Sequence, residues 1–430
     1  MTEVVAQVPG TRETGGAAPA RGLPRVPGFA GRPAEGSPKD EGKALRVSVP
    51  RAAHAAFDPD ASRPDAVTAV EESSRGRLPE LTPLRVGRMA ATPFAFLRGS
   101  AGLMAYDLAR TPVTRIGAQI CGDAHAANFG LYGDARGGLV IDLNDFDETV
   151  HGPWEWDLKR LATSLVLAGR EAGADEDTCR SAARDTAGAY RRTMRLLSKL
   201  SAQDAWNAIA DEELVSHSDA HDLLGTLERV SEKARANTSG RFAARSTERT
   251  EDGGRRFVDA PRCCAGYPTP RPPRWPPRWR STSARSRRTA TRCWPGTRCT
   301  TWRSASSAPA AWAPARTSCC SSTTGASPGP PGEGGPPSAL VPYLPAAGFD
   351  VPEAGHEGRR VVHGQKRMQV ISDNLLGWTT VDGHPFQVRQ FRNRKGSVDP
   401  AALAADQVDD YGRMTGALLA RAHAHSADPV

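Results

Sequence analysis

Residues 121–130 read Cys-Gly-Asp-Ala-His-Ala-Ala-Asn-Phe-Gly, and residues 141–148 read Ile-Asp-Leu-Asn-Asp-Phe-Asp-Glu. Residues 116–120 precede the first block, and residues 138–143 run into the second. Both are short apolar runs typical of β-strands. Five carboxylates flank the two predicted strands and the turn between them. Crowded carboxylates repel one another unless a cation or a basic partner neutralises them. These blocks therefore determine both the fold and the candidate chemistry.

The spacing of the polar residues is the one that a phosphotransferase needs. Asp123 stands five residues before Asn128, and further aspartates follow the next strand. In such a site the first Asp accepts the proton of a hydroxyl group and the Asn holds a magnesium ion. The later Asp bridges that metal to the phosphates of a nucleotide. Oxygen ligands of this kind are those that Mg²⁺ prefers.

Several segments resemble known families. The pattern Gly122-Asp123-x-His125-x-x-Asn128, followed by an Asp-Phe pair, resembles the catalytic loop and metal motif of the aminoglycoside phosphotransferase branch of kinase-like proteins. More closely, the chain resembles the bacterial domain-of-unknown-function family numbered 2252. The segments that carry this second resemblance are residues 94–99, 121–130, 143–149, 152–160, 342–344, 364–369 and 388–390.

The resemblance implies an α+β, protein-kinase-like fold that uses ATP and Mg²⁺ or Mn²⁺. Its Gly-rich and Lys-bearing elements would follow the catalytic loop, as in a circularly permuted kinase. Residue by residue, Asp123 corresponds to the catalytic base and Asn128 to the metal-holding Asn, with His125 as a hydrogen-bond partner in the catalytic loop. We favour Asp145 as the second metal ligand, because it lies twelve residues before Asp157 as in the phosphotransferase branch. The alternatives for that ligand are Asp142 and Asp147.

Other residues near these motifs have less specific interpretations. Arg98 either pairs with a buried carboxylate or binds phosphate of the nucleotide. Lys159 and Arg160 are expected on a solvated helix face, whereas Trp154 and Trp156 are expected to pack in the core. A metal site at His423 and His425 is not expected, since residues two apart lie on different faces of a helix.

The segment 262–339 differs from the rest of the chain. It has no Leu, Ile, Val, Phe or Met, and it holds twelve Arg, one acid and six of the eight Cys. Its local charge is +11, so the remaining residues carry −3 of the net +8. A hydrophobic core cannot form from this composition. A basic nucleic-acid-binding surface is therefore not inferred from the net charge.

We interpret this segment as a frameshifted and disordered insert. Shifting the reading frame from Arg298 onward permits a Gly-rich turn between β-like runs, and the other offset permits Lys-Glu-Ala near residue 335. Both elements belong to the family pattern at this place. The expected division of the chain is a disordered leader over 1–45, a kinase-like region over 46–261, the insert over 262–339, and the rest of the kinase-like domain over 340–430, shortened at its C-terminal end.

Secondary structure is predicted from periodicity and turn residues. Helices are expected within 53–88, over 156–170, 190–200, 205–230 and 357–376, and over 400–423, and Leu103, Met104 and Leu108 form a further apolar helical face. Strands are expected over 116–120, 138–143 and 386–391. The clearest helix is 156–170, where Leu158, Leu161 and Leu165 share one face.

Three functions remain open. The first is an ATP- and Mg²⁺-dependent phosphotransferase acting on a small molecule or a protein. The second is a metal-dependent phosphoesterase, which would need a Gly-Asn-His motif that the sequence lacks. The third is a non-catalytic nucleotide-binding or scaffold protein. No apolar run is long enough to span a membrane and no secretory signal is seen, so we expect a cytoplasmic protein.

Overall fold

The structure is a computed structural model. It describes residues 38–57, 59, 61–75, 82–134, 138–200, 221–238, 241, 244, 247–249, 255–257, 265–266, 303–304, 319–322, 338–353, 355–373, 376–381, 384–389 and 394–426. Most of the leader predicted over 1–45 and part of the helix predicted over 205–230 lie outside these residues. At its end the leader prediction is wrong, because α1 (Pro38–Ser48) begins at Pro38. Asp40 and Glu41 in its first turn are favourable at the positive end of a helix.

Helices make up the larger part of the described fold. The others are α2 (Ala66–Ser74), α3 (Thr82–Met89), α4 (Pro93–Gly99), α5 (Ala101–Leu108), α6 (Trp154–Glu171), α7 (Glu176–Leu197), α10 (Leu224–Ala236), α13 (Glu357–Met368) and α14 (Val408–Ala424). Four of them, α7 and α4 included, begin at side chains that accept hydrogen bonds from free N–H groups of the first turn. Asp175 accepts one from Thr178 N at 2.7 Å before α7, and Thr92 Oγ1 accepts one from Ala95 N at 3.1 Å before α4.

The described strands pair antiparallel in small sheets. β1 (Gly117–Ile120) pairs with β4 (Val150–Pro153), and β2 (Phe129–Gly133) lies between β3 (Leu139–Leu143) and β12 (Gly396–Ser397). β11 (His384–Arg389) lies between β10 (Gly377–Val381) and β9 (Cys319–Ser322). Two short pairs are β5 (Thr247–Arg249) with β6 (Arg255–Phe257), and β7 (Ala265–Gly266) with β8 (Arg303–Ser304). Helices and antiparallel strands together give the α+β class that the sequence predicted.

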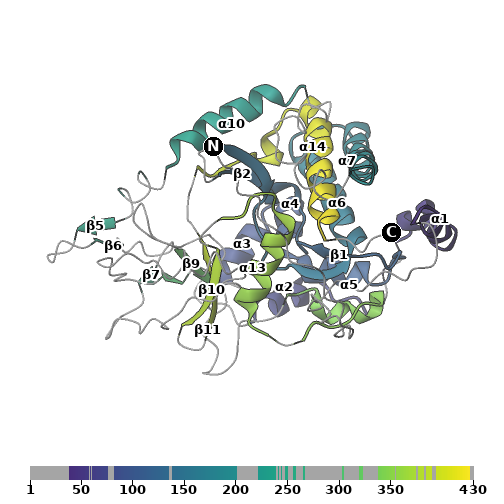
Figure 1. The fold of residues 1–430 in the computed structure, drawn as a ribbon, viewed down its shortest axis with the longest axis horizontal. Coiled ribbons are helices and arrows are strands. Elements are labelled where there is room, and N and C mark those ends of the chain that lie inside the picture. The colour runs from purple at the N-terminus through teal and green to yellow at the C-terminus, as the bar shows by residue number, and fades with distance from the viewer. Residues whose placement is uncertain are drawn as a thin grey trace, which may run out of the picture.

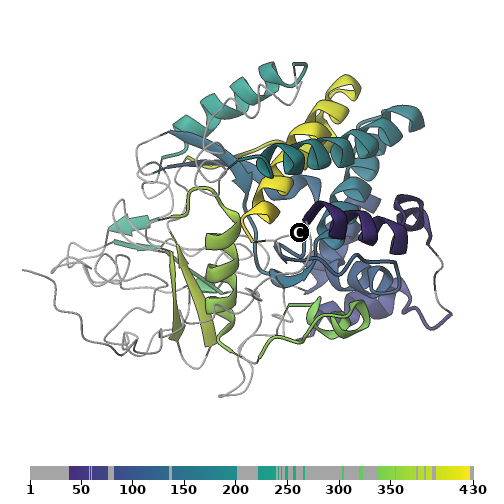
Figure 2. The ribbon, with the colours of Figure 1, turned by 45° about the vertical axis from the view of Figure 1, so that its right-hand side comes forward.

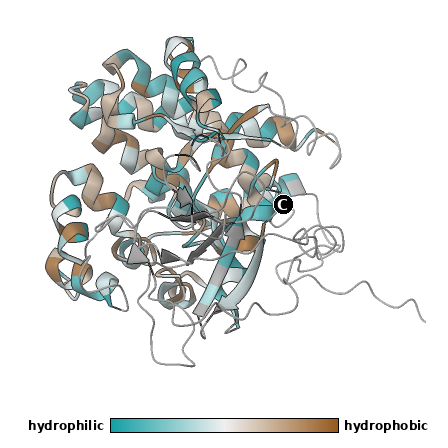
Figure 3. Ribbon diagram, turned by 90° about the vertical axis from the view of Figure 1, so that its left-hand side faces the viewer, coloured by the Kyte–Doolittle hydropathy of each residue, from teal (hydrophilic) through white to brown (hydrophobic). Residues whose placement is uncertain are grey.

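A layer of three helices, α6, α7 and α14, supports the central strands (Figures 1 and 2). α14 approaches α7 closely at Gly412 and Gly416, where an added Cβ would overlap Thr186. The helices carry hydrophilic and hydrophobic residues side by side (Figure 3), as expected of helices that bury one face. None of the described helices has the length and apolar character needed to cross a bilayer.

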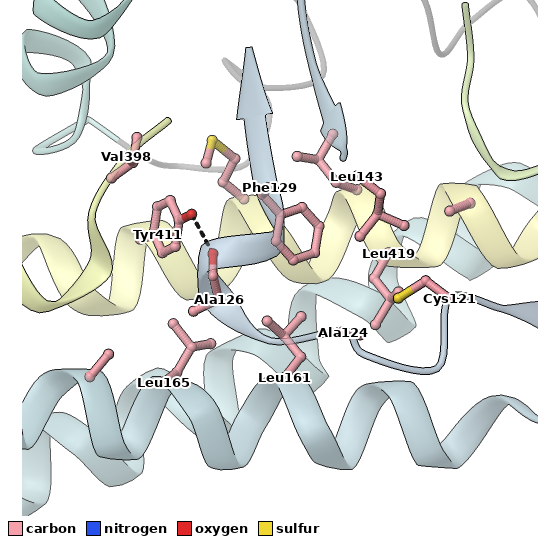
Figure 4. Close-up of a cluster of buried hydrophobic side chains, with 14 of the residues drawn as sticks. Cys121, Ala124, Ala126, Phe129, Leu143, Leu161, Leu165, Val398, Tyr411 and Leu419 are labelled. Carbon is pink, nitrogen blue, oxygen red and sulfur yellow. Dashed lines mark hydrogen bonds between the residues drawn. The ribbon is translucent and has the colours of Figure 1, made fainter. Parts of the chain in front are cut away.

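The main hydrophobic core encloses the loop after β1. Phe129, Leu161 and Tyr411 are 0% exposed, and they bring together the end of this loop, α6 and α14 (Figure 4). The Tyr411 hydroxyl donates a hydrogen bond to the Ala126 carbonyl at 2.7 Å. The backbone of the 121–130 block is therefore fixed between two helices.

α13 lies between the β10–β11 pair and the rest of the fold (Figures 1 and 2). Val362 of α13 packs with Leu376 and Trp378 in a small core of its own. On its other side α13 contacts β1 and α14. This helix thus connects the sheet of β9, β10 and β11 to the region that holds the 121–148 motifs.

Four of the predicted elements are confirmed, since 116–120, 138–143, 156–170 and 386–391 correspond to β1, β3, α6 and β11. The helix predicted over 357–376 is too long, because Gln369 takes an extended backbone and ends α13 at Met368. The helix predicted over 400–423 begins only at Val408, after two 3₁₀ turns. Most of 262–339 lies outside the described residues. Of this segment, Cys319–Ser322 pairs with β11.

Candidate functional site

The loop after β1 is anchored by a buried carboxylate in the first turn of α6. Asp157, 1% exposed, accepts hydrogen bonds from Cys121 N at 2.8 Å and from Gly122 N at 3.0 Å. Gly122 has a positive φ of 75°, and an added Cβ would overlap the Glu148 carbonyl. Only glycine takes this conformation and this close approach without strain. The residue before Asp123 is therefore fixed in both conformation and position.

Asp157 is itself held by a buried histidine of α14. His423 Nε2 lies 3.2 Å from the Asp157 carboxylate, and His423 Nδ1 lies 2.9 Å from the Tyr190 hydroxyl. His423 is 0% exposed and Tyr190 is 5% exposed. The Tyr190 ring stacks on Trp154 with the ring centroids 5.4 Å apart. This chain of contacts connects all three helices of the layer to the loop.

Asn128 joins the two motif blocks through its side-chain amide. Its Nδ2 donates to the carbonyls of Asp123 and Asp145, both at 3.1 Å, and its Oδ1 accepts from Asp145 N at 2.7 Å. It is 3% exposed. The amide is thus engaged by backbone groups on both sides. In this arrangement Asn128 positions Asp123 and Asp145 relative to each other rather than presenting a free oxygen to a metal.

Asp123 uses one of its two carboxylate oxygens in an ion pair with Arg160. Oδ1 accepts from Arg160 Nε at 2.7 Å and lies 2.5 Å from Arg160 Nη2. No described residue makes a hydrogen bond to Oδ2, which lies 3.7 Å from His125 Nε2. The Asp123 side chain is 22% exposed, against 3% for Arg160. Burial raises the pKa of Asp123, and the charges of Arg160 and Arg98 oppose that rise.

His125 is neutral in this environment. Burial lowers its pKa well below the ordinary value, and the charges of Arg160 and Arg98 lower it further. Its Nδ1 is buried with no hydrogen-bond partner among the described residues. The ring packs edge-on against Phe94, with the centroids 6.4 Å apart. His125 therefore packs beside Asp123 without adding positive charge.

Arg98 lies at the end of α4, next to the Arg160–Asp123 pair. Leu97, its neighbour in sequence, accepts a hydrogen bond from Arg160 Nη2 at 2.6 Å. Arg98 is exposed, and within the described part of the chain it makes no hydrogen bond or ion pair. Its charge lowers the pKa of both Asp123 and His125. Of the two alternatives, phosphate binding thus fits this residue better than pairing with a buried carboxylate.

The second motif block places two carboxylates in the turn after β3. Asp145 is exposed, and its Oδ1 accepts a bond from Asp147 N at 3.3 Å. Burial, and next the charge of Asp145, raise the pKa of Asp147 well above its usual range. Arg389 and Arg360 oppose this rise. A cation near these two residues would offset the cost of burying the charge of Asp147 and the repulsion between the two carboxylates.

α13 holds the same turn through one arginine. Arg360 Nη1 donates to the Thr149 carbonyl at 2.6 Å, and Nη2 donates to the Asp147 carbonyl at 2.7 Å. Its Nε pairs with Glu357 at 2.5 Å. On β11, Arg389 Nη1 lies 3.5 Å from the Asn144 carbonyl. The β10–β11 sheet and its helix therefore contact the Asp145–Asp147 turn directly.

Asp142 lies apart from this turn, inside the fold. It is 0% exposed, and its Oδ2 pairs with Arg421 at 2.6 Å and accepts from Val370 N at 3.1 Å. Its Oδ1 accepts from Leu143 N at 2.8 Å. Both oxygens are thus occupied by protein groups. Of the three aspartates considered for the metal, the geometry favours Asp145 and Asp147.

The candidate site offers carboxylates that could hold a magnesium ion together with phosphate oxygens. Within the described ranges, no three His, Cys, Asp or Glu side chains are grouped so that they could hold a metal by themselves. Mg²⁺ in phosphoryl-transfer sites is held by one or two carboxylates, with phosphate oxygens and water completing its shell. Asp145 and Asp147 supply two carboxylates, so they fit a metal that arrives with phosphates and do not form a complete metal site alone.

One prediction from the sequence is wrong at a residue that matters. Arg160 was expected on a solvated helix face, but it is 2% exposed and pairs with Asp123. Its spacing three residues after Asp157 places both side chains on the same face of α6, which was the available signal. Lys159 donates to Thr111 Oγ1 at 2.9 Å and is partly buried. The packing predicted for Trp156 is confirmed, since it is 2% exposed.

Comparison with protein families gives one match. The model of the family described as "Uncharacterized protein conserved in bacteria (DUF2252)" matches residues 77–280 and 335–430. The chain therefore belongs to this family. It matches no curated protein and no solved structure.

Proposed function

We propose that this member of the DUF2252 family is an ATP- and Mg²⁺-dependent phosphotransferase with a kinase-like, circularly permuted arrangement. Asp123 would be the general base, and Asp145 and Asp147 would hold the metal beside the nucleotide phosphates. When bound, the metal neutralises charge on the phosphates. The acceptor is a hydroxyl group of a small molecule or a protein. We place the protein in the cytoplasm.

The observation that carries the proposal is that Arg160 engages only one of the two carboxylate oxygens of Asp123. Arg160 fixes Oδ1, and Oδ2 has no hydrogen bond from a described residue. A general base needs an orientation that is fixed and an oxygen that is free. Asp157 and Asn128 hold the loop backbone on both sides, so the free oxygen has a defined position. A carboxylate with a purely structural role would have both oxygens occupied, as Asp142 has.

The permuted arrangement is supported by the contacts that later parts of the chain make with the turn of Asp145 and Asp147. In chain order, the loop with Asp123 and the turn with Asp145 come first, and the sheet of β9, β10 and β11 with α13 follows. Arg360 of α13 and Arg389 of β11 then reach back to the turn. In the proposal this sheet and helix cover the nucleotide.

A frameshift within the central segment is also part of the proposal. The family match stops at residue 280 and resumes at 335. The skipped residues lie within the stretch that has no Leu, Ile, Val, Phe or Met and that would supply the Gly-rich element. Sequencing the gene through codons 255 to 345 tests this. Compensating single-base changes near both ends support the frameshift, and an uninterrupted frame in related genes with the same residues would contradict it.

Calorimetry with the purified chain tests the function itself. ATP is titrated with Mg²⁺ and, separately, with a chelator. We expect binding that requires the metal and that weakens about tenfold in Asp145→Asn, the effect of losing about 1.4 kcal/mol. Asp177→Asn is the matched control, because Asp177 is 96% exposed on α7. Equal binding with and without metal would remove the metal role, and no binding at all would contradict the proposal.

A non-catalytic nucleotide-binding protein is the second candidate. It is favoured by the central segment, because a protein without its Gly-rich element would keep the turn at Asp145 but would lack the element that positions the phosphates for transfer. This candidate predicts nucleotide binding without phosphoryl transfer by the chain, and transfer would exclude it. The phosphoesterase has less support, since the described residues include no group of three metal-ligating side chains.

A further inference from the structure

The charged groups of the candidate site divide into two sets. Asp145 and Asp147 lie in the turn after β3, where Arg360 and Arg389 act on the pKa of Asp147. Asp123 lies in the loop after β1, and the charged groups that act most strongly on it are Arg160, Arg98 and Asp157. The first set faces the sheet of β9, β10 and β11, which we assign to the nucleotide. The second set is left for the acceptor.

Within the second set, only one charged neighbour of Asp123 is open to a ligand. Arg160 is 2% exposed and Asp157 is 1% exposed, and both are engaged by the protein. Arg98 is exposed and makes no hydrogen bond or ion pair with a described residue. An arginine fork that lacks a carboxylate partner presents several N–H donors and a full positive charge to the solvent. The charged group that remains available to a ligand near the free oxygen of Asp123 is thus the guanidinium of Arg98.

The same surroundings disfavour a positively charged acceptor. The lowered pKa of His125 favours its uncharged form. This residue therefore attracts neither an anion nor a cation by charge. The second carboxylate near Asp123, that of Asp157, is filled by the N–H groups of Cys121 and Gly122. A polycationic acceptor beside Asp123 would therefore meet the charge of Arg98, and the nearby open acid, Asp145, is assigned to the metal in the proposed function.

We infer that the acceptor carries a phosphate or carboxylate group next to the hydroxyl that receives the phosphoryl group, and that Arg98 binds this anion. The inference rests on the proposed function. In the reaction, the acceptor oxygen forms a bond to the γ-phosphorus of ATP while the bond from that phosphorus to the β-γ bridging oxygen breaks. The hydroxyl proton passes to Asp123, and ADP leaves. Arg98 would orient the acceptor by a charge-assisted, two-point contact.

Calorimetry with four small probes and no nucleotide tests the inference. The probes are glycerol 3-phosphate, glycerate, glycerol and the cationic aminoglycoside kanamycin. We expect glycerol 3-phosphate or glycerate to bind, and which of them binds more tightly identifies the anion. Binding should weaken at least tenfold in Arg98→Gln and less in Arg98→Lys, which keeps the charge but not the fork. Arg180→Gln on α7 is the control, because Arg180 is 70% exposed and remote in the chain.

Three outcomes would overturn the inference: equal binding of the anionic probes by Arg98→Gln, no binding of either anion, or binding of kanamycin in their place. Thermal melting of each variant confirms that it is folded. Titration of Mg·ATP is run separately on the same samples. If Arg98→Gln loses Mg·ATP binding as well, Arg98 belongs to the nucleotide side and the inference is wrong. If the parent binds an anion through Arg98 but never binds Mg·ATP, the proposed function fails while the anion site stands.

Discussion

Two aspartate–arginine pairs, one in the loop after β1 and one in β3, show how differently the same chemistry can be used. Asp142 in β3 is 0% exposed, and Arg421 and two backbone N–H groups occupy both of its oxygens. Asp123 in the loop is 22% exposed, and Arg160 occupies only one of its oxygens. The closed pair connects β3 to α14, whereas the open pair leaves an oxygen at the surface of the loop.

The difference separates stability from chemistry. A carboxylate with every lone pair satisfied inside the protein serves the fold, because it has nothing left to offer a ligand. A carboxylate that is oriented by one arginine and is otherwise free can accept a proton. We therefore expect substitutions at Asp142 to affect folding and substitutions at Asp123 to affect turnover.

The largest expected effect is on the open pair. Asp123→Asn keeps an oxygen for Arg160 but removes the base, so the phosphotransferase proposal predicts a loss of about 10²–10⁴-fold in ATP turnover. The measurement is ADP release under saturating Mg·ATP, with Asp177→Asn as the control. Turnover equal to that of the parent would show that the free oxygen of Asp123 has no catalytic role.

The next effect breaks the closed pair. Arg421→Gln leaves the Asp142 carboxylate buried without its cation, and we expect a loss of about 3–5 kcal/mol in the free energy of unfolding. Urea unfolding followed by circular dichroism measures it, and Arg180→Gln serves as the exposed control. A loss of unfolding free energy close to that of the control would mean that the Asp142–Arg421 pair contributes little to stability.

The two pairs were not equally visible in the sequence. Asp123 and Asn128 stand out because their spacing follows a recognisable pattern, and β1, β3 and α6 follow from apolar periodicity. Arg160 was missed because a basic residue on a helix is usually solvated, and only the position of the loop shows that it is covered. Nothing local in the sequence indicates that Asp142 would meet Arg421, since these residues are far apart in the chain.

The missed strands have a similar explanation. β2 (Phe129–Gly133) contains two glycines, and β4 (Val150–Pro153) contains a glycine and a proline, so neither has a strong strand pattern. Their pairing with β3 and β1 supplies what the local sequence lacks. The end of α13 at Met368 is likewise set by tertiary contacts, because Gln369 Nε2 donates to the Leu143 carbonyl at 2.7 Å.

A third prediction concerns pH and the turn of Asp145 and Asp147, where the Asp147 carboxylate has no ion pair with a described residue. The folded protein raises the pKa of Asp147, through burial and then the charge of Asp145, so it holds a proton that the unfolded chain releases. The stability that this residue contributes is present below the unfolded value of about pH 4 and is lost as pH rises through the folded pKa. Asp147→Asn should therefore lose less stability than the parent over this window.

Urea unfolding of the parent, Asp147→Asn and the control Asp177→Asn at a series of pH values measures that difference. Mg²⁺ added above the folded pKa should restore part of the stability of the parent but not of Asp147→Asn. Identical pH profiles for the parent and Asp147→Asn would show that the carboxylate is not shifted by its surroundings.

The smallest expected effect tests the support beneath the open pair. Tyr411→Phe removes the hydrogen bond to the Ala126 carbonyl while keeping the ring in the core, and we expect a loss of about 1 kcal/mol in stability. Urea unfolding measures this loss. No change would mean that water or another group satisfies Ala126 equally well, and the loop would then depend less on α14.

The most direct test compares the free energies of unfolding of Asp123→Asn and Asp142→Asn under the same conditions. Asparagine offers one acceptor oxygen, which suffices for Arg160 at position 123 but leaves a buried N–H group without its acceptor at position 142. We predict that Asp123→Asn loses less stability than Asp142→Asn, because Asp123 is 22% exposed and Arg160 still donates to the Leu97 carbonyl, whereas Asp142→Asn loses about 3 kcal/mol. If Asp123→Asn is destabilised as much as Asp142→Asn, Asp123 has a structural role like that of Asp142, and its free oxygen is not that of a general base.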